Sequence, residues 1–251
     1  MKKEIPILFS TPMVFAVKEE CKIVTRRLKG LEKINDNPND WEFNWMAYDI
    51  GWCFNQISTL TEENIQNKTF NQEVVKCPYG QKGDILWIRE TFANGYNDSL
   101  DQNIGKEEKD WTMKYWTFKD GSQMFSDGSY FQKDNTGNEK GFAHIKWKPS
   151  IHMPKAACRF WLEIKSIKVE RLNSINPVDA IFEGIDLYFN SMFQEQRYRD
   201  YLGNDDWKSK SEWRDPVSSF KSLWQKINGK ESWDLNPWVW VIEFKKTNKP
   251  K

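Results

Sequence analysis

The chain has 251 residues with 37 basic against 36 acidic side chains, which argues against nucleic-acid binding through bulk positive charge but leaves room for a local basic rim. Its four cysteines are far apart and form no CxxC pair, which favours reduced thiols over a disulfide framework. No signal peptide is visible and no stretch approaches the roughly 18 apolar residues of a membrane helix, so we expect a soluble, cytoplasmic protein.

The N-terminal segment predicts a strand, a short helix and a second strand. Ile5–Ser10 is typical of a buried strand. Thr11 followed by Pro12 is an N-cap with proline at the first helical position, and it predicts a helix to about Glu20. The β-branched run Ile23–Thr25 then returns the chain to extended structure.

Two long polar segments flank the next strand. Residues 31–75 are rich in asparagine and are interpreted as an insertion with some helical character. Turn residues at 77–84 lead into a predicted strand at 85–92. Residues 95–141 are again polar around short aromatic stretches, and they form a second expected insertion.

The next part of the chain predicts a long strand and a short helix. Apolar residues between 157 and 171 approximate the alternation of a strand, with a slip near Ser166 that indicates a bulge. Asn176 as cap and Pro177 as first helical residue predict a helix that Gly184 ends.

The C-terminal part predicts a third insertion at 186–214, a helix and a closing strand. Asp215 caps the helix, whose apolar residues recur at a spacing of three and four up to Asn228, and 238–244 is the strand. Helices alternate with strands too rarely for a doubly wound sheet. The expected fold is therefore α+β, a single domain over 1–251 with a small β-barrel and peripheral helices.

Chemically active side chains are most concentrated at 22–27 and near the end of the helix after Pro177. Lys22, Thr25, Arg26 and Arg27 offer an amine, a hydroxyl and two guanidinium groups. Strand alternation puts Lys22 on the face opposite Thr25 unless the chain bends, so a bend or bulge is needed to bring them to one rim. Glu183 adds a carboxylate from a distant helix.

Six segments spread over the whole chain carry a likeness to a known family: Ile7–Val14, Lys22–Arg27, Cys77–Asp84, Lys148–Pro154, Asp179–Ile185 and Asn228–Trp240. Through them the sequence resembles the ASCH family, whose fold is a PUA-like β-barrel, and in particular its longer phage-encoded and prophage-encoded members. The three expected insertions lie outside the likeness. For a phage protein, the expected compartment is the cytoplasm of the host.

The resemblance implies a pocket beside the barrel for a nucleoside, a modified nucleotide or an RNA segment. We expect no cofactor, no metal, because no cysteine spacing supports a metal site, and no membrane partner. One bacterial branch of the family hydrolyses the amide of N4-acetylcytidine with a lysine, a threonine three residues later and a glutamate on a downstream helix. Carried over by position, these are Lys22, Thr25 and Glu183. The residues around them, Cys21 and Val24 included, differ from that branch.

Cleavage of an N4-acyl cytosine needs a nucleophile, a base and an acid for the leaving nitrogen. We expect Thr25 to be the nucleophile. Lys22 would be its base if burial and the neighbouring arginines lower its pKa, and Glu183 would protonate the leaving nitrogen. The alternative is that Lys22 and the arginines form salt bridges, that Thr25 merely suits a strand, and that Glu183 accepts a capping or ion-pair hydrogen bond.

Further residues are candidates for binding the substrate. Arg26 and Arg27 suit a phosphate, Lys148 and His152 could follow a nucleic-acid backbone, and Trp87 could stack on a base. Against this, Lys148 suits a solvated face, His152 a structural role and Trp87 a buried position.

Three functions therefore compete at the level of the sequence. The first is a metal-independent amidohydrolase of N4-acylated cytosine nucleosides. The second is a non-catalytic module that binds RNA or a modified nucleotide, and the third and weaker one is a metal-independent ribonuclease. No GxxxxGK[ST] or GxGxxG loop is present, which argues against a nucleoside triphosphatase. The oligomeric state is open.

Overall fold

The computed structural model describes residues 2–47, 50–96, 114–119, 123–125, 130–131, 147–191, 194–203 and 212–250. Most of the expected insertion at 95–141 and a part of 186–214 thus lie outside the described residues. The helices are α1 Thr11–Lys18, α2 Glu32–Asn35, α3 Glu62–Asn67, α4 Pro177–Phe182 and α5 Pro216–Asn228. The strands are β1 Glu4–Leu8, β2 Val24–Arg27, β3 Trp41–Ala47, β4 Gly51–Gln56, β5 Gln72–Val75, β6 Ile85–Arg89, β7 Phe92–Tyr96, β8 Lys114–Phe118, β9 Gln123–Phe125, β10 Tyr130–Phe131, β11 Trp161–Arg171, β12 Leu187–Asn190, β13 Glu195–Arg199, β14 Glu212–Trp213 and β15 Trp238–Thr247.

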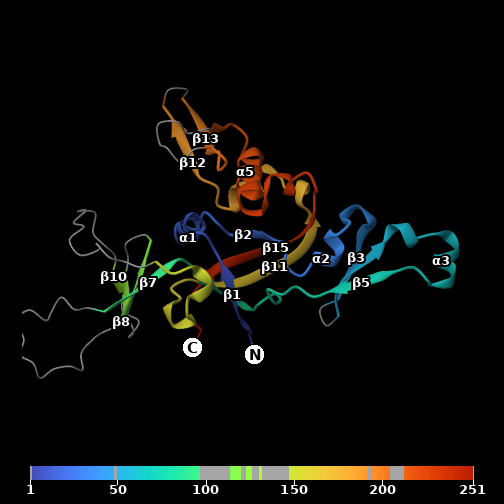
Figure 1. Ribbon diagram of the computed structural model, residues 1–251, viewed down its shortest axis with the longest axis horizontal. Coiled ribbons are helices and arrows are strands. Elements are labelled where there is room, and N and C mark those ends of the chain that lie inside the picture. The colour runs from blue at the N-terminus through green and yellow to red at the C-terminus, as the bar shows by residue number, and fades with distance from the viewer. Residues whose placement is uncertain are drawn as a thin grey trace, which may run out of the picture.

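A five-stranded sheet in the order β1-β6-β11-β15-β2 forms the centre of the molecule (Figure 1). β1 and β6 run parallel and the other neighbours are antiparallel. The protein is therefore α+β, with a core made mostly of sheet, as expected from the sequence. The pairing of the described strands leaves β1 and β2 as the two edges of this sheet, so these strands do not close into a barrel.

The long strand β11 is irregular in its middle. Its register with β15 shifts between Ile164 and Ser166, which confirms the predicted slip. A bulge bends the strand and increases its twist. The two long strands β11 and β15 curve together across the molecule, and the edge strand β2 continues that curvature (Figure 1).

Helix α4 begins and ends where the sequence predicts. The Asn176 side chain accepts a hydrogen bond of 2.8 Å from the backbone N–H of Asp179, and Pro177 is the first helical residue. After the helix, Gly184 has a φ of +81°, a conformation that glycine adopts without strain. The backbone N–H of Ile23 donates to the carbonyl of Phe182 at 3.0 Å, so the end of α4 lies against the start of β2.

Helix α5 confirms the predicted cap Asp215, whereas the predicted cap Thr11 is wrong, because α1 already begins at Thr11 and Ser10 holds the cap position. The Asp215 carboxylate accepts hydrogen bonds from the backbone N–H groups of Val217 and Ser218. The helix buries Phe220, Leu223 and Trp224. Its Ser219 donates to the carbonyl of Arg199 at the end of β13, and Ser222 accepts from the backbone N–H of Tyr201. As a result one apolar face of α5 is turned toward the core beside β2.

Three smaller sheets project from the central one in different directions (Figure 1). The segment 31–75, for which we expected helical character, forms mainly the antiparallel sheet β3-β4-β5, with α2 and α3 as short helices. The expectation was only partly right because tertiary packing determines this segment. Trp52 packs edge-on against Trp240 with their ring centroids 4.9 Å apart, and Phe54 packs against Trp238 with their ring centroids 5.2 Å apart.

The apolar residues form two clusters. The larger one fills the space between the central sheet, α1 and α5. The smaller one surrounds Trp87, Phe92 and Trp161, and it lies on the opposite face of β6, because the residues of this strand alternate between the two clusters. No helix in the described part of the chain has both the length and the apolar character that crossing a membrane requires.

Replacing Gly184 should destabilise the fold through both its φ and its neighbours. An added Cβ would lie 2.7 Å from the Cβ of Ala16 and 2.8 Å from that of Lys22. Gly83 also has a positive φ, +90°, but a Cβ there meets nothing within 4 Å. We expect Gly184→Ala to lower the free energy of unfolding by about 2 kcal/mol more than Gly83→Ala in urea titrations. Equal losses would mean that this close approach does not hold α4 in place.

Candidate functional site

A pocket of about 510 Å³ lies between the edge strands β1 and β2 of the central sheet and the face of α5 that carries Phe220, Leu223 and Trp224. Its lining comes from the end of β1, from β2, from the residue after α4 and from the second half of α5. This volume is within the range of small-molecule sites in proteins. The pocket contains Lys22, Thr25 and Glu183, the three residues that the resemblance assigns to the reaction.

Lys22 reaches the pocket because it precedes β2 and does not belong to it. β2 starts at Val24, so the alternation of a strand does not apply to Lys22. The backbone N–H of Lys22 donates to the carbonyl of Ala16, and this turn after α1 directs its side chain toward α4. The required bend is therefore supplied by a turn. Thr25 lies within β2, opposite Ile242 of β15, and is 3 % exposed.

The Lys22 ammonium donates three hydrogen bonds inside the protein. Its Nζ lies 2.8 Å from the carbonyl oxygen of Val24, 2.6 Å from that of Glu183 and 2.8 Å from the Oε2 of the Glu183 carboxylate. An ammonium has three N–H donors, so all of them have acceptors. Lys22 and Glu183 are both buried, at 3 % and 4 % exposed, which makes this an ion pair shielded from water.

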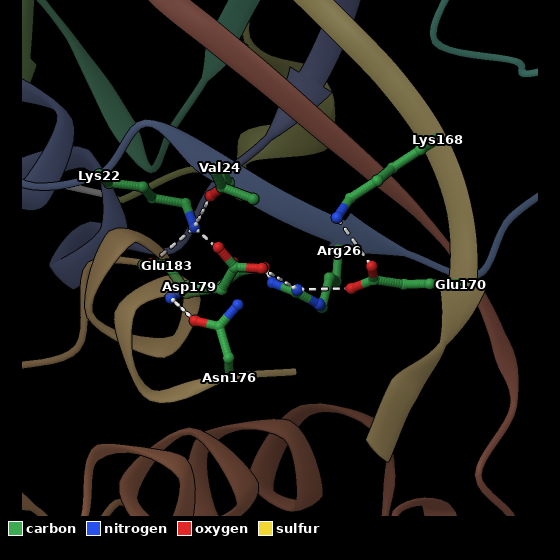
Figure 2. Close-up of polar contacts among 8 residues, drawn as sticks. All are labelled: Lys22, Val24, Arg26, Lys168, Glu170, Asn176, Asp179 and Glu183. Carbon is green, nitrogen blue, oxygen red and sulfur yellow. Dashed lines mark hydrogen bonds and ion pairs between the residues drawn. The ribbon is translucent and has the colours of Figure 1, made fainter. Parts of the chain in front are cut away.

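Glu183 lies between Lys22 and Arg26 (Figure 2). Its Oε1 accepts a hydrogen bond of 3.2 Å from Nη1 of Arg26. Nη2 of Arg26 donates to Oε1 of Glu170 at 2.6 Å and to Oδ2 of Asp179 at 3.0 Å. The buried guanidinium therefore joins β2 to α4 and to β11 through carboxylates.

Burial and charge act differently on the two cations of this network. Burial lowers the pKa of Lys22, since removing water disfavours the charged form, and Glu183 offsets only a part of this effect. Burial also opposes the charge on Arg26, but Glu183 and Glu170 together with Asp179 outweigh it, and the pKa of Arg26 is raised. Lys22 is therefore the group in this network that burial brings nearer to losing its proton.

Arg27 lines the same pocket with a different environment. Its Nη2 donates to the backbone carbonyl of Leu8 at 2.9 Å, which joins the edge strand β2 to the end of β1. Its guanidinium lies over the ring of Phe9, 5.1 Å from the ring centre. Burial lowers the pKa of Arg27, and within the described residues its side chain makes no ion pair.

Three of the residues proposed for substrate binding lie outside the pocket. Trp87 is 8 % exposed and packs in the smaller apolar cluster, so its ring is not a free stacking surface. Lys148 pairs through its backbone with Phe92, and His152 lies exposed in a short 3-10 turn. None of the three lines the pocket.

The structure adds residues that the sequence analysis did not select. Tyr79 and Trp224 line the pocket beside Arg27. The indole Nε1 of Trp224 is buried without a hydrogen-bond partner within the described chain, and the same holds for Nε of Arg26 and Nε of Arg27. In the sequence, Trp224 differed in no way from the other core residues of its helix.

Neither the cysteines nor the acidic residues indicate another centre. Burial raises the pKa of the Cys77 and Cys158 thiols to about 12 in each case, which keeps them as unreactive thiols. All four cysteines are free. The described ranges contain no group of three or more His, Cys, Asp or Glu side chains that could hold a metal ion.

No protein-family model, curated protein or solved structure matches the chain. The assignment of a function therefore depends on the geometry of the pocket and on the residue pattern.

The Glu183 carboxylate should matter far more for stability than the other carboxylates around Arg26. Glu183→Gln leaves the buried Lys22 ammonium without its counter-charge, and we expect a loss of about 3 kcal/mol in the free energy of unfolding. Asp179→Asn removes a partner whose side chain is 25 % exposed, with an expected loss below about 1 kcal/mol.

Both variants are measured by urea unfolding at pH 7. Adding Lys22→Met to Glu183→Gln should restore a part of the loss, because no buried charge is then left unpaired at this position. Similar losses of unfolding free energy in the two single variants would contradict the central role of Glu183. A double variant that is less stable than Glu183→Gln alone would contradict it as well.

Proposed function

We propose that this chain is an ASCH-type domain with a PUA-like core, whose pocket takes an N4-acylated cytosine and hydrolyses its exocyclic amide. The observation that carries the proposal is the presence of Lys22, Thr25 and Glu183 in one pocket, although Glu183 is 161 residues from Lys22 in the chain. These are the residue types, in the same order, that the amidohydrolase branch of the family uses. The curved central sheet corresponds to the PUA-like core, and the three smaller sheets to insertions.

The reaction proceeds in two stages, the formation of a threonine ester and the hydrolysis of that ester. The Thr25 hydroxyl attacks the acyl carbon while its proton passes to the neutral amine of Lys22. The C–N bond then breaks, the protonated carboxyl of Glu183 gives its proton to N4, and cytosine leaves with an amino group. Water next hydrolyses the threonine ester and releases the carboxylic acid, which restores Thr25.

This cycle requires Lys22 as an amine and Glu183 as a carboxylic acid. The hydrogen bond of 2.8 Å between Nζ and Oε2 allows the proton to move from Lys22 to Glu183 without a change in net charge. Burial disfavours the charged form of Lys22, which supports the amine that the reaction needs. Arg26 holds the other oxygen of Glu183 in place by a hydrogen bond of 3.2 Å.

A non-catalytic reader of a modified nucleotide or of RNA is the second candidate, and one observation favours it. All three donors of the Lys22 ammonium are already bound to acceptors, as in a purely structural ion pair. In that case the pocket binds its ligand without turnover. Release of acetate or cytidine from N4-acetylcytidine separates the two candidates.

The reaction should depend on the Thr25 hydroxyl. Thr25→Val keeps the shape and the strand preference of the side chain but removes the oxygen, and we expect turnover of N4-acetylcytidine to fall about a thousandfold or more. Thr25→Ser keeps the hydroxyl and should retain most of the activity. Thr247→Val at the end of β15 is a matched control outside the pocket.

Cytidine formation is followed by chromatography. If Thr25→Val turns over as the parent does, Thr25 is not the nucleophile. If the parent binds N4-acetylcytidine but releases no product, the protein is a reader.

The pH dependence should follow Lys22. The active form carries one proton on the Lys22–Glu183 pair, as the amine and the carboxylic acid, so a pH at which Lys22 loses its proton to solvent also removes the acid. Burial lowers the pKa of Lys22 below its usual 10.5, and we therefore expect kcat/KM to fall as the pH passes this lowered pKa, in assays from about pH 6 to 10. Lys22→Arg, which stays protonated, should abolish turnover at every pH. A kcat/KM that keeps rising up to about pH 10 would mean that Lys22 and Glu183 do not share the proton of the active form.

A further inference from the structure

The charges of the candidate site divide into a balanced network and two cations outside it, Arg27 and the exposed Lys29. Lys22, Arg26 and Lys168 pair with the carboxylates of Glu170, Asp179 and Glu183, so that three cations meet three anions (Figure 2). Each of these charges has a partner within 3.2 Å. The network therefore has no charge left over for a ligand.

Arg27 is the partly buried one of the two pocket cations that this network leaves out. Its hydrogen bond to Leu8 goes to a neutral carbonyl, and its Nε has no acceptor within the described residues. Neighbouring Tyr79 does not supply an anion, because burial raises the pKa of its phenol and keeps it protonated. A partly buried guanidinium without a counter-charge is costly, and an anion bound in the pocket would offset that cost.

One further donor at the same pocket lacks an acceptor. The buried Nε1 of Trp224 has no hydrogen-bond partner among the described residues, and the phenol of Tyr79 is a potential donor in the lining. Buried N–H groups in proteins are nearly always bonded to protein, water or ligand. A pocket with an unpaired N–H group and with two cations that make no ion pair in the described part of the chain is complementary to a ligand that carries negative oxygen atoms. A planar guanidinium matches phosphate in particular.

We propose that the pocket takes a nucleoside monophosphate in preference to a nucleoside, with the phosphate bound at Arg27. This inference rests on the proposed function for the nucleoside part of the ligand and adds the phosphate. It also assigns different roles to the two adjacent arginines. Arg26 positions Glu183, and Arg27 binds the substrate.

The proposal is tested by calorimetry with cytidine and cytidine monophosphate on the full chain. We expect the monophosphate to bind at least about tenfold more tightly at low salt, as one charge-assisted contact provides. Because the phosphate takes its second charge near pH 6, this preference should grow between about pH 5 and 8. A preference of less than about twofold, or one that does not change with pH, would overturn the proposal.

Variants of Arg27 test whether this residue binds the phosphate. Arg27→Gln should reduce the preference for cytidine monophosphate over cytidine to about twofold or less, while Arg27→Lys, which keeps a point charge, should retain a part of this preference. Arg214→Gln is the matched control, since the Arg214 side chain is 74 % exposed and lies outside the pocket. Loss of the preference in Arg214→Gln, or its persistence in Arg27→Gln, would overturn the proposal. If Arg27→Gln fails to fold, the pH dependence of the parent still decides.

The outcome is independent of whether the protein is an enzyme. Tight binding of the monophosphate without deacylation would leave the phosphate site standing and remove the proposed hydrolysis. Deacylation of N4-acetylcytidine and its monophosphate with equal kcat/KM, unaffected by Arg27→Gln, would keep the hydrolysis and remove the phosphate site. Tighter binding of an N4-succinyl cytidine than of the monophosphate would place the anion at the acyl end and overturn the assignment to phosphate.

Discussion

The rest of the site depends on the buried ion pair between Lys22 and Glu183. It joins the turn before β2 to the end of α4, and Arg26 extends it to β11. Burying these charges is costly, and the cost is offset only because every donor of Lys22 and both oxygens of Glu183 are hydrogen-bonded. The backbone of α4 must therefore end at one position, and the approach of Gly184 to Lys22 achieves this.

The same network gives different chemistry to two adjacent arginines. Arg26 is surrounded by carboxylates from β11 and from α4 with its C-terminal end, whereas Arg27 is bonded to a backbone carbonyl and shares the pocket with the Nε1 of Trp224, which has no partner among the described residues. Neighbouring residues in a strand point to opposite faces of the sheet, so the side chains of Arg26 and Arg27 leave β2 in different directions. Only the Arg26 side chain therefore joins the network of carboxylates. A central sheet whose edges do not pair leaves room for a ligand between them, and α5 covers that space.

The local features of the fold were predictable from short stretches of sequence. The caps Asn176 and Asp215, the end of α4 at Gly184 and the bulge near Ser166 each depend on a few neighbouring residues. The sheet formed by 31–75 was not predicted, because its aromatic residues are arranged to pack on Trp240 and Trp238 and not to alternate visibly. The PUA-like barrel, the compartment and the catalytic roles remain predictions from the resemblance.

The sequence by itself determined which side chains are available and where α4 and α5 begin and end, since capping and glycine conformation act over a few residues. Only the tertiary structure decided their partners. It brought Glu183 to Lys22 across 161 residues, buried Trp87 in a second core and left Arg27 outside the ion pairs of the described residues. Such pairings depend on how the sheet curves and how α4 and α5 pack on it, and no local pattern encodes these long-range contacts.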